Sequence, residues 1–323
     1  MKSFWELGFR SLFFLGTLFS SLFILIWVFV FTLQLPLSNG LTPGQWHGQQ
    51  MIYGFTIPVI VGFVLTASQN WTGTIGVTGR PLHVLAGIWL FARLAAFIGA
   101  LAVPVGFALD GFFIAYSFVL LWPYLKPPKF ARNSIFLVVL GIVFAANFLS
   151  VYFYYTGNIH LISASQSFVI NNVVIVILVI ARRVIPFFTE RVLTEANVRP
   201  SKVLMKASFV ATVAYAAVDL VFPLSLQISL VAGVCAAVHL ALSVCWYDRR
   251  IWKHSILWIL HLGYFWIFLG FALKSLAYFF PIMPMLPLHA FTTGGVGVII
   301  YGMVSRVSLG HTGRKLVVPK MIV

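Results

Sequence analysis

The sequence contains little charge. Of its 323 residues, 61% are hydrophobic and 8% are charged, whereas about a quarter of the residues in a soluble domain are charged. Six residues are acidic, and this scarcity argues against hydrolysis by paired carboxylates. Such a composition excludes an ordinary soluble domain and indicates an integral membrane protein.

The motifs of several enzyme classes are also missing. The sequence has no P-loop, no Gly-x-Ser-x-Gly elbow and no Cys-x-x-Cys pair for zinc or covalent haem. Its two cysteines, Cys235 and Cys245, fall on one predicted helix about 15 Å apart, too far for a disulfide. Function therefore depends on histidines, on Arg93 and a bound cofactor, or on transport.

Long apolar runs recur along the whole chain. They predict an all-α bundle of ten transmembrane helices within a single integral membrane domain, residues 1–323. The longest connection, Ala181 to Lys206, is too short to form a core of its own. The runs cover residues 11–34, 47–68, 81–103, 104–124, 133–155, 160–181, 205–222, 226–246, 254–276 and 287–309.

The basic residues are distributed unevenly among the connections. If the N-terminus lies inside, all 21 of them except Arg93 and Lys274 fall in segments on the inner side. This asymmetry predicts that both termini are cytoplasmic. The net charge of +15 is then a feature of topology that attracts anionic lipid, and we expect no nucleic-acid partner.

Three histidines begin predicted helices on the outer side, and methionines accompany two of them. Met51 follows one turn after the first histidine, and Met283 and Met285 precede the last. Imidazole with thioether is a ligand set for Cu(I), although methionines also fill gaps in packing. We predict that at least two of these imidazoles converge on one outward-facing site, with Trp46 as its interfacial lid. The three are His47, His160 and His289.

Other polar residues lie deeper in apolar runs. His261 needs a partner, which is either an interhelical hydrogen bond or a cofactor. Arg93 needs one too, and Asp110 or a haem propionate would serve. Cys235 and His239, one turn apart, form a weaker pair of soft ligands or simply pack. The remaining histidines are expected at headgroup level beside basic residues, namely His83, His254 and His311.

A glycine-rich stretch near the end of the chain resembles the signature of a known family. The stretch HAFTTGGVGVIIYGMVSRVSLGHTGR, His289 to Arg314, is similar to that of the NnrS proteins. Further similar stretches follow in family order, including WHGQQMIYGF from Trp46 and GRPLHVLAGIWLFARL from Gly79. The resemblance implies a multi-pass protein of the bacterial inner membrane that contains haem and copper and is associated with the nitric-oxide response.

The resemblance also implies candidate sites and ligands. The expected partners are membrane lipid, haem, and nitric oxide or iron–nitrosyl species. Haem is the main expected cofactor, and copper is an additional one. Whether the protein is an enzyme is not decided by the sequence. The matching positions are His47, Arg93, His160, Arg183, His261, His289, Arg306 and His311. Our candidates for binding haem are His47, His160, His261, His289 and Arg93, and those for copper are His47, Met51 and His289.

Two departures from the family pattern leave alternatives open. The family usually reads Trp-His-x-His-Glu where this chain has Trp46-His47-Gly48-Gln49-Gln50, and amides are poor metal ligands. The family usually also carries about two further helices after the His-Thr-Gly-Arg segment, so we expect this chain to lack them. The alternatives are a permease for a small solute or metal ion, without redox chemistry, and a structural remnant depleted of cofactor.

The charge pattern makes the topology testable with reporter fusions after Lys129, Lys202 and Lys253. All three are expected to report the cytoplasm, because the basic connections stay on that side of the membrane. A periplasmic signal at any one of the three sites would overturn the topology.

Overall fold

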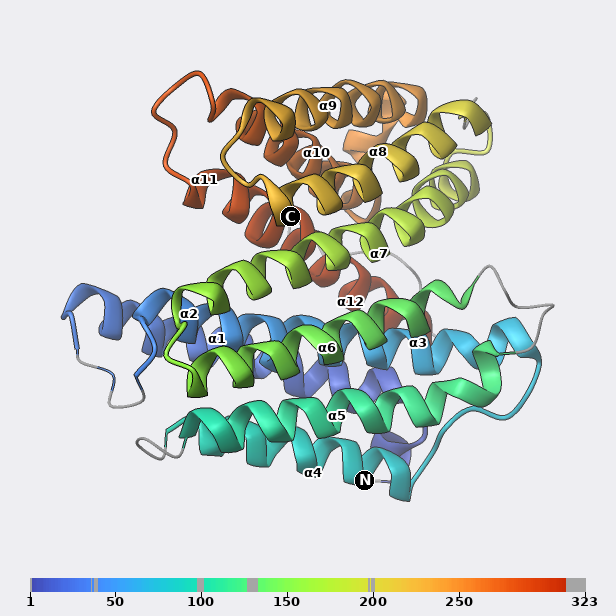
Figure 1. The fold of residues 1–323 in the computed structure, drawn as a ribbon. Coiled ribbons are helices and arrows are strands. Elements are labelled where there is room, and N and C mark those ends of the chain that lie inside the picture. Colours follow the sequence, from blue (N-terminus) through green and yellow to red (C-terminus); the bar gives the residue numbers. More distant parts are fainter. Residues whose placement is uncertain are drawn as a thin grey trace. The chain divides into compact units, whose positions relative to one another are not determined.

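The described part of the chain is built from helices, as a lipid environment requires. No water is available in the hydrocarbon region, so backbone groups must bond within their own segment. The computed structural model describes residues 2–35, 37, 40–97, 102–126, 133–196, 198 and 201–311, and every regular element in these ranges is a helix (Figure 1). The predicted all-α membrane bundle is therefore confirmed.

The chain forms two compact units, of which the first is Met1–Val169. It starts with a 3-10 turn and contains one π-helical segment, labelled η2, between α2 and α3. Its elements are η1 (Lys2–Trp5), α1 (Gly8–Thr32), α2 (Pro43–Gln49), η2 (Gln50–Thr56), α3 (Ile57–Thr72), α4 (Arg80–Ala95), α5 (Ala102–Leu125), α6 (Ile135–Tyr155) and the beginning of α7 (His160–Val192).

The second unit is Ile170–Val323. It contains the rest of α7 and a second π-helical segment, η6. The other elements of this unit are α8 (Lys202–Val221), α9 (Leu226–Trp246), η5 (Arg249–Lys253), α10 (Ser255–Leu276), α11 (Met285–His289), η6 (Ala290–Gly297) and α12 (Val298–His311).

In the turn after α9, hydrogen bonds from Arg250 lower the pKa of Asp248 to about 2, so this carboxylate stays ionised near neutral pH.

The helices follow the predicted spans with two differences. Within the described residues, nine helical segments are long and apolar enough to cross a membrane, against ten predicted. The exception is α4, which has 16 residues where the apolar run covers 81–103, and the end of that run lies partly outside the described residues. The other difference is α7, which continues to Val192 instead of ending near residue 181. The orientation of the termini and the single-domain organisation stay predictions.

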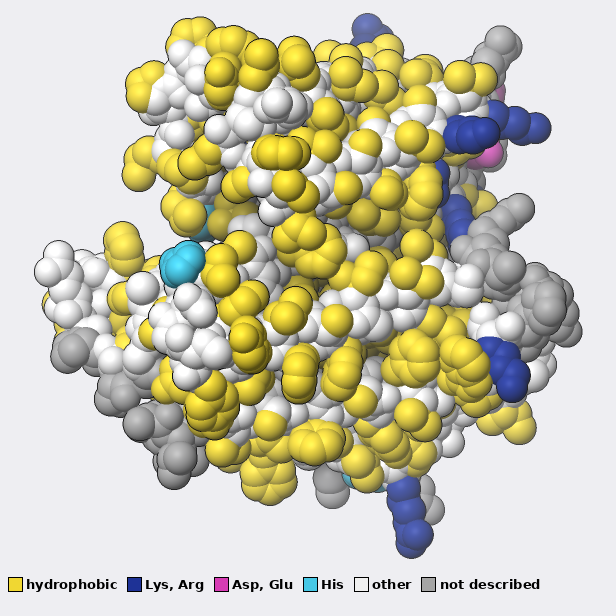
Figure 2. All heavy atoms as spheres, in the orientation of Figure 1, with side chains coloured by type: hydrophobic (Ala, Val, Ile, Leu, Met, Phe, Trp, Pro, Cys, Tyr) yellow, Lys and Arg dark blue, Asp and Glu magenta, His cyan; other side chains and the backbone are white. Residues whose placement is uncertain are grey.

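Many large apolar side chains lie on the surface. In α1, Phe29 and Phe31 are 62% and 66% exposed, and Figure 2 shows hydrophobic side chains over most of the face in view. Soluble proteins rarely expose apolar patches of this extent. Hydrocarbon is the medium in which such a surface is stable.

Helices of the second unit approach closely where a glycine faces a neighbour. A Cβ built on Gly263 of α10 would lie 2.5 Å from Cγ1 and 3.1 Å from the backbone nitrogen of Ile299 on α12. Apolar area drives little association within lipid, so close backbone contact of this kind contributes much of the packing.

This contact predicts that Gly263→Ala destabilises the protein, because the added methyl group overpacks against backbone. The loss in free energy of unfolding should be about 1–3 kcal/mol. Gly141→Ala in α6 is the matched control, since its Cβ meets nothing within 4 Å; removing glycine there should stabilise the helix by roughly 0.5–1 kcal/mol. Equal unfolding free energies for the two variants in mixed micelles would contradict the packing argument.

Candidate functional site

The segment that carries His47 starts with a well-formed helix cap. In α2 the Gln45 backbone N–H donates to Thr42 Oγ1 at 3.3 Å, and the Thr42 N–H donates to Gln45 Oε1 at 3.1 Å, with Pro43 in the first turn. This reciprocal capping box satisfies backbone donors that the first turn leaves open. The Gln45 amide also donates to the Ile159 carbonyl at 2.7 Å, which fixes the start of α2 beside the start of α7.

Both units contain a short helix with a histidine that leads directly into a π-helical segment. In the first unit, α2 carries His47 and continues as η2, Gln50–Thr56. In the second, α11 ends at His289 and continues as η6, Ala290–Gly297. π-Helical segments are rare, and they occur frequently at functional sites because the extra residue re-aims the side chains around it.

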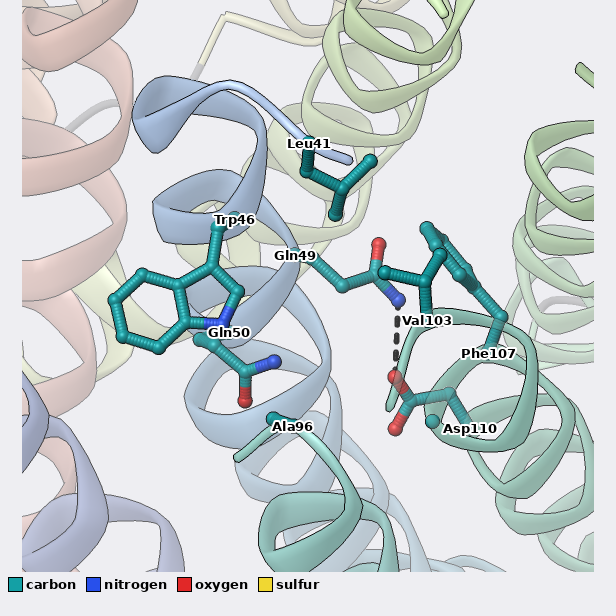
Figure 3. Close-up of a pocket in the computed structure, with 9 residues that line it drawn as sticks. Leu41, Trp46, Gln49, Gln50, Ala96, Val103, Phe107 and Asp110 are labelled. Atoms are coloured by element: carbon teal, nitrogen blue, oxygen red, sulfur yellow. Dashed lines mark hydrogen bonds between the residues drawn. The ribbon is translucent and has the colours of Figure 1, made fainter. Parts of the chain in front are cut away.

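A buried ion pair joins α4 to α5. Arg93 pairs with Asp110, and each side chain is 4% exposed. Arg93 Nη1 also donates to Gln50 Oε1 at 2.5 Å. Gln49 Nε2 donates to Asp110 Oδ2 at 2.9 Å, the bond marked in Figure 3. The structure therefore confirms the predicted pairing of Arg93 with Asp110 and adds the two amides. Such support matters, since a buried ion pair repays its desolvation cost only when its remaining polar atoms are bonded.

The two amides reproduce the hydrogen-bond polarity of the family pattern. An imidazole N–H at position 49 would donate to Asp110 as the Gln49 amide does, and a carboxylate at position 50 would accept from Arg93 as Gln50 does. The departure from His-Glu to Gln49-Gln50 keeps donor and acceptor in place and removes one ionisable pair.

A small cavity of about 20 Å³ lies beside this ion pair. Trp46 lines it, is 3% exposed and packs its ring against Phe23 inside the unit, and its role as an interfacial lid stays a prediction. Neither Trp46 Nε1 nor Gln49 Oε1 has a hydrogen-bond partner among the described residues. This volume suits one water molecule, not a porphyrin. The lining residues are Leu41, Trp46, Gln49, Gln50, Ala96, Val103, Gly106, Phe107 and Asp110.

The three outer histidines differ in their surroundings. The His47 ring stacks on Trp27 with centroids 4.5 Å apart and 29° between the planes, whereas His160 and His289 are exposed. His289 Nδ1 lies 2.8 Å from the Met285 carbonyl oxygen. Because a carbonyl can only accept, Nδ1 carries the proton, and in the neutral ring Nε2 carries the lone pair. The predicted convergence of two or more of these imidazoles stays a prediction.

The deeper histidines form hydrogen bonds between helices. His261 Nε2 lies 3.2 Å from Thr189 Oγ1, whose own hydrogen is donated to the Ile185 carbonyl. His261 is therefore the donor, which confirms the interhelical version of its prediction. The contacts of His239 were not predicted from the sequence. This residue is fully buried, and its Nε2 lies 3.0 Å from Thr212 Oγ1 and its Nδ1 2.7 Å from the Tyr264 hydroxyl. Both of its nitrogens are occupied, so it does not form a soft ligand pair with Cys235.

The methionines proposed as copper ligands have no common surroundings. Met51 packs against the apolar cluster around Phe23, while Met283 and Met285 are 67% and 52% exposed. No group of three or more His, Cys, Asp or Glu side chains in the described ranges is placed to hold a metal ion.

A second ion pair inside a spanning region was not predicted from the sequence. Lys274 Nζ on α10 lies 2.7 Å from Asp219 Oδ1 on α8, and the Asn171 amide donates to Asp219 Oδ2 at 2.8 Å. The distribution of basic residues indicated that Lys274 needs a partner, because Lys274 and Arg93 are the two basic residues outside the inner segments. Each is paired with an aspartate within its own unit.

These observations define a polytopic helical membrane protein with ion pairs inside its units and histidines at helix starts. A family model described as NnrS protein matches residues 3–323. The chain belongs to the NnrS family, which is linked to the nitric-oxide response. No curated protein and no solved structure matches this chain.

The ion pair can be tested by a double-mutant cycle in mixed micelles. Arg93→Leu leaves the Asp110 carboxylate buried without its cation and should lower the free energy of unfolding by about 3–5 kcal/mol. Arg93→Leu combined with Asp110→Leu should lose less than the single variant, since no charge remains. Arg10→Leu, which breaks the exposed Arg10–Glu6 pair, is the control and should cost less than about 1 kcal/mol. A double variant whose loss equals the sum of the losses of Arg93→Leu and Asp110→Leu measured separately would show that the pair is not coupled.

Proposed function

We propose that this protein binds haem and protects the cell against nitric oxide and nitrosative stress, with His47 and His289 each serving as an axial ligand. The observation that carries the proposal is the shared arrangement of these histidines, each placed just before a π-helical segment. Family membership supports the nitric-oxide context.

The donor chemistry of His289 fits an iron ligand. Its Nδ1–H is bonded to the Met285 carbonyl, which is the second contact that histidine ligands usually make in metal sites. This bond fixes the tautomer and directs the lone pair to Nε2. An imidazole oriented in this way binds iron without first losing a proton.

The surroundings of His47 suit a flat ligand. Its ring lies against Trp27 and, with centroids 6.2 Å apart and planes 21° from parallel, against Phe23. Aromatic rings offer broad apolar faces on which a planar macrocycle packs well. The Asp110 cavity is not that place, because its volume of about 20 Å³ is far too small.

The other candidates have different support. His160 is exposed at the start of α7, and His261 donates its Nε2 hydrogen to Thr189, so His261 would have to bind iron through Nδ1. The charge of Arg93 is neutralised by Asp110. We therefore assign Arg93 to holding α4 against α5, and not to a haem propionate.

Copper has less support than haem. Gln49 and Gln50 are engaged with Asp110 and Arg93, and Met51 packs in an apolar cluster. The copper proposal then rests on His47, Met51 and His289 alone. Bound haem would supply an iron centre for nitric oxide, tuned by its axial ligand and by the polarity of the pocket.

An absorption spectrum and metal analysis of the purified protein test the proposal. The wild type should show a haem band with iron, and His47→Ala and His289→Ala should each reduce haem content at least several-fold. His254→Ala is the control, because this histidine lies beside basic residues at a helix end, and it should retain haem. A colourless, metal-free wild type would refute the proposal and favour the permease or the cofactor-depleted alternative.

A further inference from the structure

Two arginines are buried in the described part of the chain, and their surroundings differ. Arg93 has a carboxylate partner in Asp110. Arg306, on α12, is 4% exposed and lies one turn before Gly310, the last residue of the candidate span within the described residues. Its guanidinium carbon lies 3.2 Å from the centroid of the Phe188 ring on α7.

Among the described residues, no carboxylate forms an ion pair with Arg306. Its Nη1 is buried and has no hydrogen-bond partner among the described residues, none of which forms an ion pair with it. The charge that acts on it is a second cation, Arg191 of α7. A buried cation without an anion is strongly unfavourable, and stacking on Phe188 offsets part of that cost only.

We propose that Arg306 binds an oxyanion of the phosphate type, with Arg191 as the second cation of the site. The Phe188 ring covers one face of the guanidinium, so the anion would approach its edge, where the N–H fork bonds two oxygens in parallel. The proposal does not depend on haem binding.

Two sources could supply such an anion. The position one turn from the end of a span is close to headgroup level, where phospholipid phosphodiesters lie. Inorganic phosphate from solution has the same oxygen geometry. Both would neutralise Arg306, but only the lipid would be delivered from the bilayer.

Thermal unfolding in maltoside micelles, which contain no phosphate, distinguishes these sources. Phosphatidylglycerol is added in one arm, and in the other arm inorganic phosphate replaces chloride at equal ionic strength. The wild type should gain on the order of 5 °C in Tm with the anion that it binds, because a ligand specific to the folded state stabilises it. A gain with lipid alone identifies the headgroup, and a gain with inorganic phosphate identifies a site open to solution.

Arg306→Gln should abolish this gain, because the amide keeps a donor and loses the charge. Arg249→Gln is the matched control: it removes an exposed arginine and should retain the gain. The proposal is overturned if the wild type responds to neither anion, or if Arg306→Gln responds as the wild type does. Should Arg306→Gln not fold, Arg306→Lys replaces it, and its half-saturating concentration should rise at least ten-fold because an ammonium cannot form the fork.

Discussion

A polar group in the hydrocarbon region of a bilayer has no water to bond, and most features of this structure follow from that constraint. The Arg93–Asp110 pair shows how it works. The two charges neutralise each other, and the Gln49 and Gln50 amides satisfy further oxygen and nitrogen atoms around them. Because these residues come from α2, η2, α4 and α5, satisfying one ion pair fixes several helices of the first unit together.

The same constraint sorts the histidines by what they bond. His239 is bonded at both nitrogens inside the second unit, and the packing of Phe271, whose ring lies parallel at 5.2 Å, completes its environment. It is structural. His261 uses one nitrogen for an interhelical bond. His47 and His289, in short helices that lead into π-helical segments, are the histidines that we propose as haem ligands.

Buried cations with a carboxylate partner explain how helices associate, whereas a buried cation without one points to an external ligand. In the Lys274–Asp219 pair and in the Arg93–Asp110 pair, each cation has a carboxylate partner, and these pairs explain helix association. Arg306, buried beside Arg191, lacks its anion among the described residues. With six acidic residues in the protein, few carboxylates are available to a buried cation, and an external oxyanion is another way to neutralise its charge.

The sequence by itself determined that this is a helical membrane protein, where most spans run, and which histidines stand at helix starts. Apolar run length and helical period carry this information locally. It also offered Asp110 as one of two possible partners for Arg93, since they are 17 positions apart and acids are scarce. Only the tertiary structure decided that Gln49 and Gln50 serve this ion pair, that Lys274 meets Asp219, and that His239 lies between Thr212 and Tyr264. These partners are on different helices, and the period of one helix shows which residues share a face but not which neighbour that face meets.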